Sequence, residues 1–382
     1  MQPSTSSVQE PALAQPAPVR RLLSLDTLRG FDMFWIMGGE EIFHALAKTT
    51  GWAWAIFMAD QFTHVDWNGF RPYDCIFPLF LFLAGVSTPY SLGSRLAKGD
   101  SRALLARKVI TRGLILVLLG IVYNNGLFVK SIAEMRFGSV LGRIGLAGMF
   151  AQLIYLYVQN ERIRYGIFAG ILLGYWALLM LVPVPGYGAG NLTMEGSLVG
   201  YVDRLFMPGR LYKVVHDPEG LLSTLPAIGT GLLGVFAGSI LRQHGVRDSR
   251  KLQQLVIAGV ACVALGWLWN LAFPINKNLW TSSFVLVAGG WSLLILSLFY
   301  WIIDMQNVRG WTFFFVIIGM NSILIYLAER FIDFEYTTHF LFSGLLHLFN
   351  EPVQAVGAVI AFLAVKWAFL YFLYKKNTFL RV

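Results

Sequence analysis

The chain carries little charge. Only 13% of its 382 residues are Asp, Glu, Lys or Arg, whereas 56% are hydrophobic. Soluble domains carry about 25% charged residues, and the mean hydropathy of this chain is +0.61. Many of its apolar runs are long enough to cross a bilayer, where only helices and closed barrels satisfy the backbone. The composition therefore excludes an ordinary soluble domain and predicts an all-α fold, a polytopic transmembrane helix bundle.

Cysteine and the common catalytic signatures are also scarce. Cys75 and Cys262 are the two cysteines, and they lie far apart, within or beside apolar runs. This excludes a disulfide framework and offers no metal-binding motif. The sequence contains no HExxH, no P-loop and no GxSxG motif. We therefore expect no metal cofactor, and the signatures of zinc proteases, P-loop NTPases and serine hydrolases are missing.

The net charge of +9 comes from basic residues in the short loops between apolar runs. That distribution marks the cytoplasmic loops of a membrane protein, so we expect the lipid bilayer as a partner and no nucleic acid. Residues 1–19 are rich in Pro, Ala, Ser and Gln and lack a signal-peptide pattern. They predict a disordered cytoplasmic tail before a single transmembrane domain at 20–382, with both termini in the cytoplasm. Ten spans are expected at about 25–47, 73–92, 109–129, 139–158, 165–182, 222–241, 252–273, 281–303, 311–331 and 352–374.

Polar residues concentrate in the stretch FTHVDWNGFRPYDCIFP at 62–78, just before an apolar run. It contains His64, Trp67, Asn68 and Asp74. Polar groups are costly at a bilayer surface unless they are used, and a histidine can gain or lose a proton near neutral pH. This stretch is therefore the predicted reaction or binding centre, although His64 could equally be an interfacial histidine satisfied by solvent.

Three further polar motifs fall on the same predicted side of the membrane. An acidic pair near the end of an apolar helix cannot both face solvent freely, so we expect either Glu40 or Glu41 to face the bundle. The acids of the HDPEG motif could bind substrate or could cap the following helix. The NKNLW motif could be a polar turn, or it could recognise a sugar with its tryptophan as a stacking face. With Trp67 and Asn68, the candidates for substrate binding are Glu40, Glu41, Asp217, Glu219, Asn276, Lys277, Asn278 and Trp280.

Three polar residues lie inside predicted spans. Arg143 needs an acceptor there, either a carboxylate or an anionic ligand, and Asn321 and Ser322 could make ordinary helix–helix hydrogen bonds. The residues alone therefore indicate a ten-helix protein with a polar site at its outer face and do not name a reaction.

The motifs resemble the heparan-α-glucosaminide N-acetyltransferase family, including its bacterial NagX-type members. The HxxWNGxxxxDxxFP and NKNLW strings are specific, and the resemblance covers nearly the whole chain after the tail. It is carried by LLSLDTLRG (22–30), FTHVDWNGFRPYDCIFPLFLFLAGVS (62–87), SVLGRIG (139–145), HDPEGLLSTLPAIGTGLLGVFAG (216–238), PINKNLW (274–280) and GMNSILIY (319–326).

The resemblance implies a transmembrane acyltransferase-like fold in a bacterial inner membrane, and a homodimer. It implies acetyl transfer from cytoplasmic acetyl-CoA, as co-substrate, to the amine of a glucosamine-type sugar in the periplasm. His64 and Asp74 match the family's catalytic residues. Two departures are expected: no counterpart of the animal enzyme's large luminal domain, and Glu40 in place of an asparagine, which leaves the acceptor sugar open. Candidates for binding the cofactor are Arg29, Arg107, Lys108, Arg112, Arg143, Asn321 and Ser322.

A histidine suits this reaction because an amine must be neutral to attack a thioester. Asp74 could orient the imidazole of His64 and stabilise its protonated form, while Asn68, Asn276 or a backbone N–H could stabilise the oxyanion. His64 could act as general base in direct transfer, which we prefer, or carry an acetyl group itself. Two other functions stay open: an amino-sugar or N-acetylglucosamine permease without chemistry, and an O-acetyltransferase of envelope glycans.

Overall fold

The computed structural model describes residues 22–127 and 131–380. The predicted tail, 1–19, lies outside the described residues. Within them the chain is helical with two isolated β-bridges and no strand. The α-helices are α1 (Leu23–Phe34), α2 (Glu41–Thr50), α3 (Ala53–Gln61), α4 (Ile76–Ala97), α5 (Arg102–Asn125), α6 (Val140–Tyr157), α7 (Glu161–Leu181), α8 (Leu198–Phe206), α9 (Thr224–Leu241), α10 (Asp248–Trp269), α11 (Ser282–Phe299), α12 (Thr312–Met320), α13 (Ser322–Phe331), α14 (Phe334–Leu346) and α15 (Glu351–Lys375). Two π-helical segments, η1 (Trp35–Gly39) and η4 (Tyr300–Met305), and two 3₁₀ segments, η2 (Pro72–Cys75) and η3 (Ile132–Glu134), complete them.

Seven helical segments of the described chain are long and apolar enough to cross a membrane, and the bent pair α12–α13 makes eight. The prediction of a polytopic helical bundle is confirmed. The other two predicted spans are also helical, at α1–η1–α2 and at α5. The first is interrupted, and α5 carries four basic residues in its first three turns, so neither is a long uninterrupted apolar helix.

The first predicted span, 25–47, is broken where a continuous helix was expected. Its chain passes through the π-helical η1, in which Gly38 has a φ of 113°. That conformation favours glycine because a side chain would be strained there. The Nζ atom of Lys366 on α15 donates a hydrogen bond to the carbonyl of Met37 at 2.6 Å. The break is thus held by a contact with a helix more than 300 residues away in sequence.

The predicted span at 311–331 is bent by 66° between α12 and α13. Asn321 sits at this bend and binds the C-terminal segment. Its Nδ2 donates to the carbonyl of Thr378 at 3.0 Å, and its Oδ1 accepts from the N–H of Leu380 at 3.1 Å. Asn321 therefore fastens the end of the described chain to the bend and does not join two transmembrane helices.

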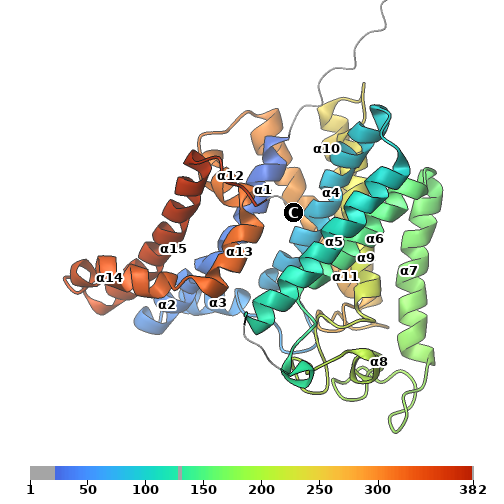
Figure 1. Cartoon of the computed structure of the whole chain (residues 1–382), viewed down its shortest axis with the longest axis horizontal. Coiled ribbons are helices and arrows are strands. Elements are labelled where there is room, and N and C mark those ends of the chain that lie inside the picture. The colour runs from blue at the N-terminus through green and yellow to red at the C-terminus, as the bar shows by residue number, and fades with distance from the viewer. Residues whose placement is uncertain (1–21, 128–130, 381–382) are drawn as a thin grey trace, which may run out of the picture.

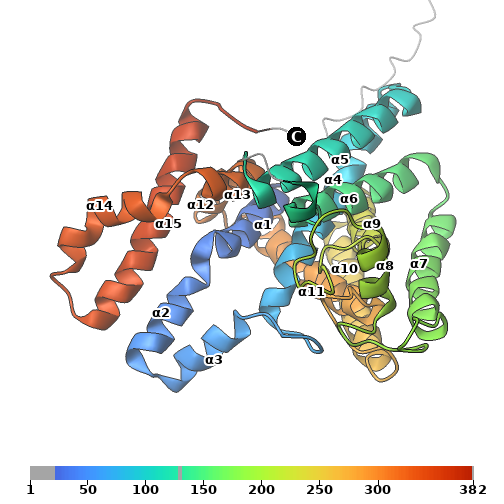
Figure 2. The ribbon, with the colours of Figure 1, turned by 60° about the horizontal axis from the view of Figure 1, so that its bottom comes forward.

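The centre of the bundle is formed by α4, α9 and α11, with α7 and α10 at its edge (Figure 1). A Cβ atom on Gly85 would lie 2.1 Å from the carbonyl oxygen of Gly231, and one on Gly234 would lie 2.0 Å from that of Phe82. The backbones of α4 and α9 therefore touch, as small residues permit in membrane bundles. Helices α2, α14 and α15 form a second group on the far side of α1, α12 and α13 (Figures 1 and 2).

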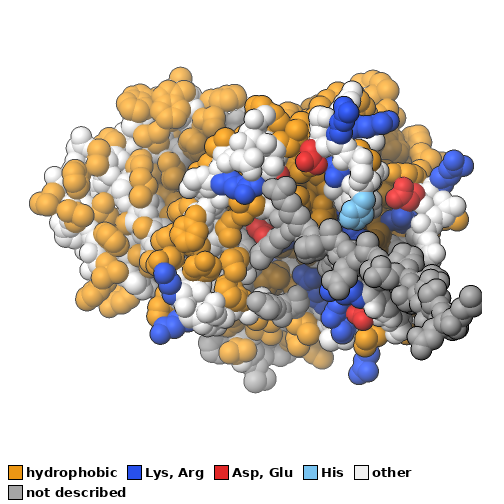
Figure 3. Space-filling view, turned by 90° about the horizontal axis from the view of Figure 1, so that it is seen from above, with side chains coloured by type: hydrophobic (Ala, Val, Ile, Leu, Met, Phe, Trp, Pro, Cys, Tyr) orange, Lys and Arg blue, Asp and Glu red, His pale blue; other side chains and the backbone are white. Residues whose placement is uncertain are grey.

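The two ends of the bundle differ in charge. One end, here called the His64 face, is built from α2, α3 and the segments 62–71, 182–223 and 270–281 (Figure 2). Figure 3 looks onto the opposite end and shows Lys and Arg side chains over it, with mostly hydrophobic side chains around its edge. We call this end the basic end. Its exposed cations include Arg95, Lys98, Arg102, Arg107, Lys108, Arg247 and Arg250.

Candidate active site

His64 lies in the loop between α3 and η2, and η2 leads directly into α4. Its Nδ1 atom is 2.8 Å from Oδ1 of Asp74, whose side chain is 1% exposed. The other carboxylate oxygen of Asp74 accepts the backbone N–H of Arg71 at 3.1 Å, which closes the turn of η2. An ionised carboxylate next to Nδ1 places the proton of a neutral imidazole on Nδ1. The Nε2 atom is therefore the acceptor that His64 offers, and half of the side chain is exposed.

Lys277 completes this group from the loop between α10 and α11. Its Nζ atom lies 2.9 Å from Nδ1 and 3.0 Å from Nε2 of His64, and 3.5 Å from Oδ1 of Asp74. An atom that is equally close to both ring nitrogens lies over the imidazole face, since the ring's own C–H groups block an in-plane approach. Burial lowers the pKa of the Lys277 ammonium, and the carboxylate of Asp74 opposes that shift. A base, a carboxylate and a primary amine thus meet at one point.

Hydrogen bonds between two loops hold these residues together. Asn276 donates from Nδ2 to Oδ1 of Asn68 at 3.1 Å, and the N–H of Gly69 donates to the carbonyl of Ile275 at 2.8 Å. Asn278 donates to the carbonyl of Asp66 at 3.3 Å. Asn276 is fully buried, and its own oxygen accepts the N–H of Leu279. Asn276 is therefore used to build the loop, whereas Asn68, four residues after His64 in the sequence, is exposed.

The two tryptophans proposed to contact substrate are both packed into the protein. Trp280 is 1% exposed, and its Nε1 donates to Oγ1 of Thr230 at 3.2 Å. The expectation that it offers a stacking face to a sugar is therefore wrong, because its ring is covered by protein. Trp67 is partly buried, and its Nε1 donates to the carbonyl of Leu192 at 2.9 Å. Its ring meets His216 edge to face with centroids 5.6 Å apart.

The acids of the HDPEG motif bind an arginine. Arg136 contacts both carboxylate oxygens of Asp217, at 2.9 and 2.7 Å, and also pairs with Glu219. Burial raises the pKa of Glu219. Burial also acts to raise that of Asp217, but the Arg136 guanidinium holds it below its ordinary value. Asp217 is fully buried and does not cap α9. Arg136 was missed from the sequence, which gives no signal that pairs it with the HDPEG acids about 80 residues later.

Two further buried polar side chains, His216 and Asp203, lie next to this ion pair. Their burial was not predicted from the sequence. His216 is fully buried, and burial lowers its pKa to about 4. Asp203 on α8 is fully buried as well, and burial raises its pKa to about 6, although its Oδ1 accepts the N–H of Leu221 at 2.9 Å. Both groups are therefore held closer to neutrality than in water. Asp203 holds the segment 207–223 through its bond to Leu221, and His216 is part of that segment.

Arg143 lies on the wrong side of the bundle to meet a ligand at the basic end. It is 2% exposed, its Nη2 bonds to Ser223 and to the carbonyl of Gly220, and its guanidinium lies 4.9 Å from the ring centroid of Trp280. Among the described residues its Nε and Nη1 atoms have no hydrogen-bond partner, so the choice between a carboxylate and an anionic ligand stays a prediction.

Glu40 and Glu41 point in different directions. Glu41 is exposed, whereas Glu40 is partly buried and shares a hydrogen bond with the hydroxyl of Tyr73. The ring of Tyr73 lies 4.6 Å from the imidazole of His64, centroid to centroid. Glu40 is therefore connected to His64 through Tyr73, whereas Glu41 faces solvent.

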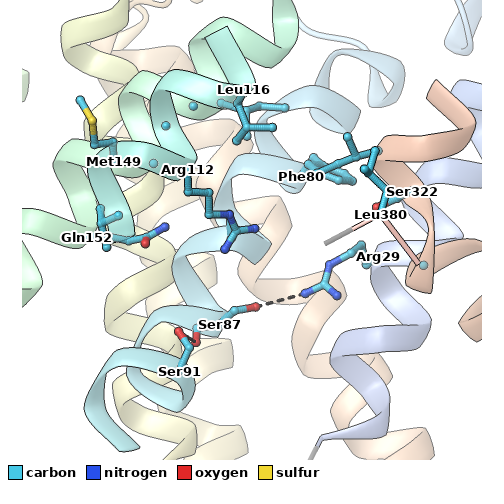
Figure 4. Close-up of a pocket in the computed structure, with 18 of the residues that line it drawn as sticks. Arg29, Phe80, Ser87, Ser91, Arg112, Leu116, Met149, Gln152, Ser322 and Leu380 are labelled. Carbon is cyan, nitrogen blue, oxygen red and sulfur yellow. Dashed lines mark hydrogen bonds between the residues drawn. The ribbon is translucent and has the colours of Figure 1, made fainter. Parts of the chain in front are cut away.

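A pocket of about 300 Å³ opens toward the basic end, between α1, α4, α5, α6 and α13. Figure 4 shows the guanidinium groups of Arg29 and Arg112 extending into it from opposite sides. Arg29 donates to Oγ of Ser87 at 3.1 Å and pairs with Asp26 at 3.4 Å. The other polar side chains of the wall are Ser91, Gln152 and Ser322.

Two of the basic residues predicted to bind the cofactor are not in this pocket. Arg107 and Lys108 are exposed on the outside of α5 and do not line it. Arg107 is five residues before Arg112 and so faces another direction on the helix. Lys108 shares a face with Arg112 but lies one turn nearer the start of α5, where it is exposed. Asn321 is likewise behind the wall, holding the C-terminal segment whose Leu380 lines the pocket.

Helix α4 connects the pocket to His64. Phe80, Ala84, Ser87 and Ser91 line the pocket along one face of this helix. At 1.5 Å per residue they cover about 17 Å of its length. Asp74 lies six residues before Phe80 in the chain, which is about 9 Å further along the same axis. The pocket therefore ends about two helical turns short of the His64–Asp74 pair.

No protein-family model matches the chain. It is similar to the heparan-alpha-glucosaminide N-acetyltransferase of Homo sapiens, with 29% identity over 425 residues that cover 95% of this chain and 60% of that protein. It is also similar to the protein of the same name from Mus musculus, with 28% identity, covering 84% of this chain and 56% of that protein. The chain thus spans somewhat over half the length of these curated relatives.

Proposed function

Since the chain is a relative of the heparan-α-glucosaminide N-acetyltransferases over most of its length, we propose that it is a membrane-embedded acetyltransferase. It moves the acetyl group of acetyl-CoA, bound at the basic end, to the primary amine of a glucosamine-type sugar at the His64 face. The observation that carries this proposal is the His64–Asp74 pair at one end of α4, whose other end lines a pocket with two arginines.

The His64–Asp74 pair fits the proton transfer that the reaction needs. Nε2 of His64 accepts a proton from the acceptor ammonium, and the neutral amine then attacks the thioester carbon. Asp74, at 2.8 Å from Nδ1, holds the ring in place and stabilises the imidazolium that forms. As the C–N bond forms and the C–S bond breaks, the thiolate leaves and takes the second proton that the amine nitrogen loses. Asn68, exposed in the loop that carries His64, is the side-chain amide that we assign to bind the developing oxyanion.

The pocket at the basic end fits a polyanionic co-substrate. Arg29 and Arg112 extend into one cavity (Figure 4). Guanidinium groups bind phosphates through paired, charge-assisted hydrogen bonds. The apolar walls contributed by Phe80 and Leu116 suit a long thin arm directed along α4. Ser322 also lines this pocket and stays a candidate for binding the cofactor.

The proposed orientation places the basic end in the cytoplasm of a bacterium and the His64 face in the periplasm. Exposed arginines and lysines concentrate at the basic end, and such residues mark cytoplasmic loops. Acetyl-CoA is a cytoplasmic metabolite in this scheme. The acetyl group alone then crosses the bilayer, while the sugar and the nucleotide stay on their own sides.

Acetyl transfer by the purified protein tests the proposal. Wild type in detergent, with radiolabelled acetyl-CoA and glucosamine, is expected to form N-acetylglucosamine, and His64→Ala is expected to lose it. His244→Ala, at an exposed histidine in the loop between α9 and α10, is the matched control and should behave as wild type. No binding of acetyl-CoA to the wild-type protein would refute the proposal. Uptake of unmodified sugar into proteoliposomes without product would favour a permease instead.

A further inference from the structure

Lys277 occupies the position in which an acceptor amine would be activated. Its Nζ atom is a primary amine within 3.0 Å of both nitrogens of His64. The Lys277 side chain is 20% exposed, and that of Asp74 below it is 1% exposed. Nothing in the proposed transfer to a sugar requires a protein amine at this point.

We propose that Lys277 is itself an acetyl acceptor, modified on Nζ by the protein's own bound acetyl-CoA when no sugar fills the site. This inference rests on the proposed acetyltransferase activity. The reaction is the same as that with the sugar, except that the nucleophile is tethered. A tethered nucleophile in contact with its base has a high effective concentration.

The chemistry balances with groups that are already in place. The Lys277 side chain turns from the imidazole face to the in-plane lone pair of Nε2, where His64 removes one proton from its ammonium and releases it to solvent. The neutral Nζ attacks the thioester carbonyl carbon, so a C–N bond forms and the C–S bond breaks. The second proton that the nitrogen loses goes to the departing thiolate. Burial, which lowers the pKa of Lys277, increases the fraction of neutral amine available for attack.

Acetylation would change the site. The modified side chain carries no positive charge, so Asp74 loses the cation that now lies 3.5 Å from its Oδ1. The larger amide would also stay within reach of Nε2, which the acceptor amine must approach. Protein exposed to acetyl-CoA without sugar is therefore expected to lose activity over time, and sugar is expected to protect it by competing for the same position.

Lys213 provides an internal control for spontaneous acetylation. It lies on the same face of the protein in the segment 207–223 and is exposed, with its Nζ 5.7 Å from the ring centroid of Tyr212. It makes no contact with His64 among the interactions of the described chain. Acetyl-CoA reacts slowly with any accessible lysine, so the rate at Lys213 measures that background in the same sample.

The test is peptide mass spectrometry of the full chain in detergent, incubated with acetyl-CoA and no acceptor. Acetylation of Lys277 is expected about 10²-fold faster than of Lys213, the low end of a general-base contribution. In His64→Ala the two rates should become equal. Asp74→Asn should slow Lys277 without affecting Lys213, and it keeps the test valid if His64→Ala does not fold. Glucosamine should slow the modification of Lys277 alone.

Two outcomes separate this inference from the activity on which it rests. If Lys277 is modified no faster than Lys213 while glucosamine is still acetylated, the inference fails and the proposed function stands. If neither Lys277 nor glucosamine is acetylated, the proposed function fails as well. Equal rates at Lys277 in wild type and His64→Ala would mean that exposure, and not the base, controls the reaction, which also overturns the inference.

Discussion

Replacing Asp74 by Asn tests how the candidate site works, because the change keeps the size of the side chain and removes its charge. The amide oxygen can still accept the backbone N–H of Arg71, but the amide nitrogen then faces Nδ1 of His64 and donates to it, which moves the imidazole proton to Nε2. The amide no longer stabilises a positive imidazole at His64, whose Nδ1 lies 2.8 Å away. We therefore expect the fold to persist and the transfer rate to fall.

The size of the loss follows from Coulomb's law and from the exposure of the histidine. Two unit charges about 4 Å apart attract by about 4 kcal/mol at an effective dielectric constant near 20. His64 is 50% exposed, so water screens this attraction, and roughly half of it, about 2 kcal/mol, remains to be lost. The lost charge alone, about 2 kcal/mol in the barrier, is about 30-fold in kcat/KM, and the change of tautomer adds to this loss.

The assay is kcat/KM for glucosamine at saturating acetyl-CoA, with the melting temperature measured alongside. Asp66→Asn is the matched control, since Asp66 is an exposed acid in the same loop. It is expected to stay within about threefold of wild type. If Asp74→Asn also stays within that range while its melting temperature is unchanged, Asp74 does not stabilise the imidazolium, and the triad-like interpretation is refuted.

Three further predictions test other parts of the structure. Arg29→Gln should raise the KM for acetyl-CoA about tenfold by removing a charged contact, whereas Lys108→Gln, at an exposed cation outside the pocket, should leave it unchanged; an equal effect of both would refute the pocket. Burial raises the pKa of Asp203 to about 6, above its unfolded value near 3.9. The folded state therefore binds more protons, so this group's contribution to stability is lost as pH rises from about 4 to 6. Asp203→Asn should reduce the fall in melting temperature over that window, and an unchanged profile would contradict this assignment. Lys366→Met should destabilise the protein by about 3 kcal/mol, because it leaves the Glu329 carboxylate without the cation 3.0 Å away; a melting temperature equal to that of wild type would count against the ion pair.

The sequence predicted the helices well because each span is a local run of apolar residues. It did not predict where the spans break. The π-helical turn at Gly38 is held by Lys366, and the bend at Asn321 is held by the C-terminal segment near Thr378. A run of apolar residues carries no information about such distant partners. The interruption in the first span was foreshadowed by two consecutive glycines, Gly38 and Gly39, which a continuous helix tolerates poorly.

The candidate site shows the same division between local and distant information. The family resemblance pairs His64 with Asp74, ten residues later in the same short loop, and the structure contains a hydrogen bond between them. The meeting with Lys277 depends on hydrogen bonds between loops about 200 residues apart, so motif strings could place both on one side but not in contact.

Burial is the property that the sequence conveys least, and it separates the candidate residues. Trp280 and Arg143 look like binding groups by residue type, yet each is at most 2% exposed and is packed against the other. Asp217 resembles a catalytic acid but binds the unpredicted Arg136 through both of its oxygens. A polar residue on the correct side of the membrane can therefore either meet substrate or hold the loop that does. His64, Asn68 and Lys277 remain accessible, and for that reason the proposed chemistry is assigned to this part of the face.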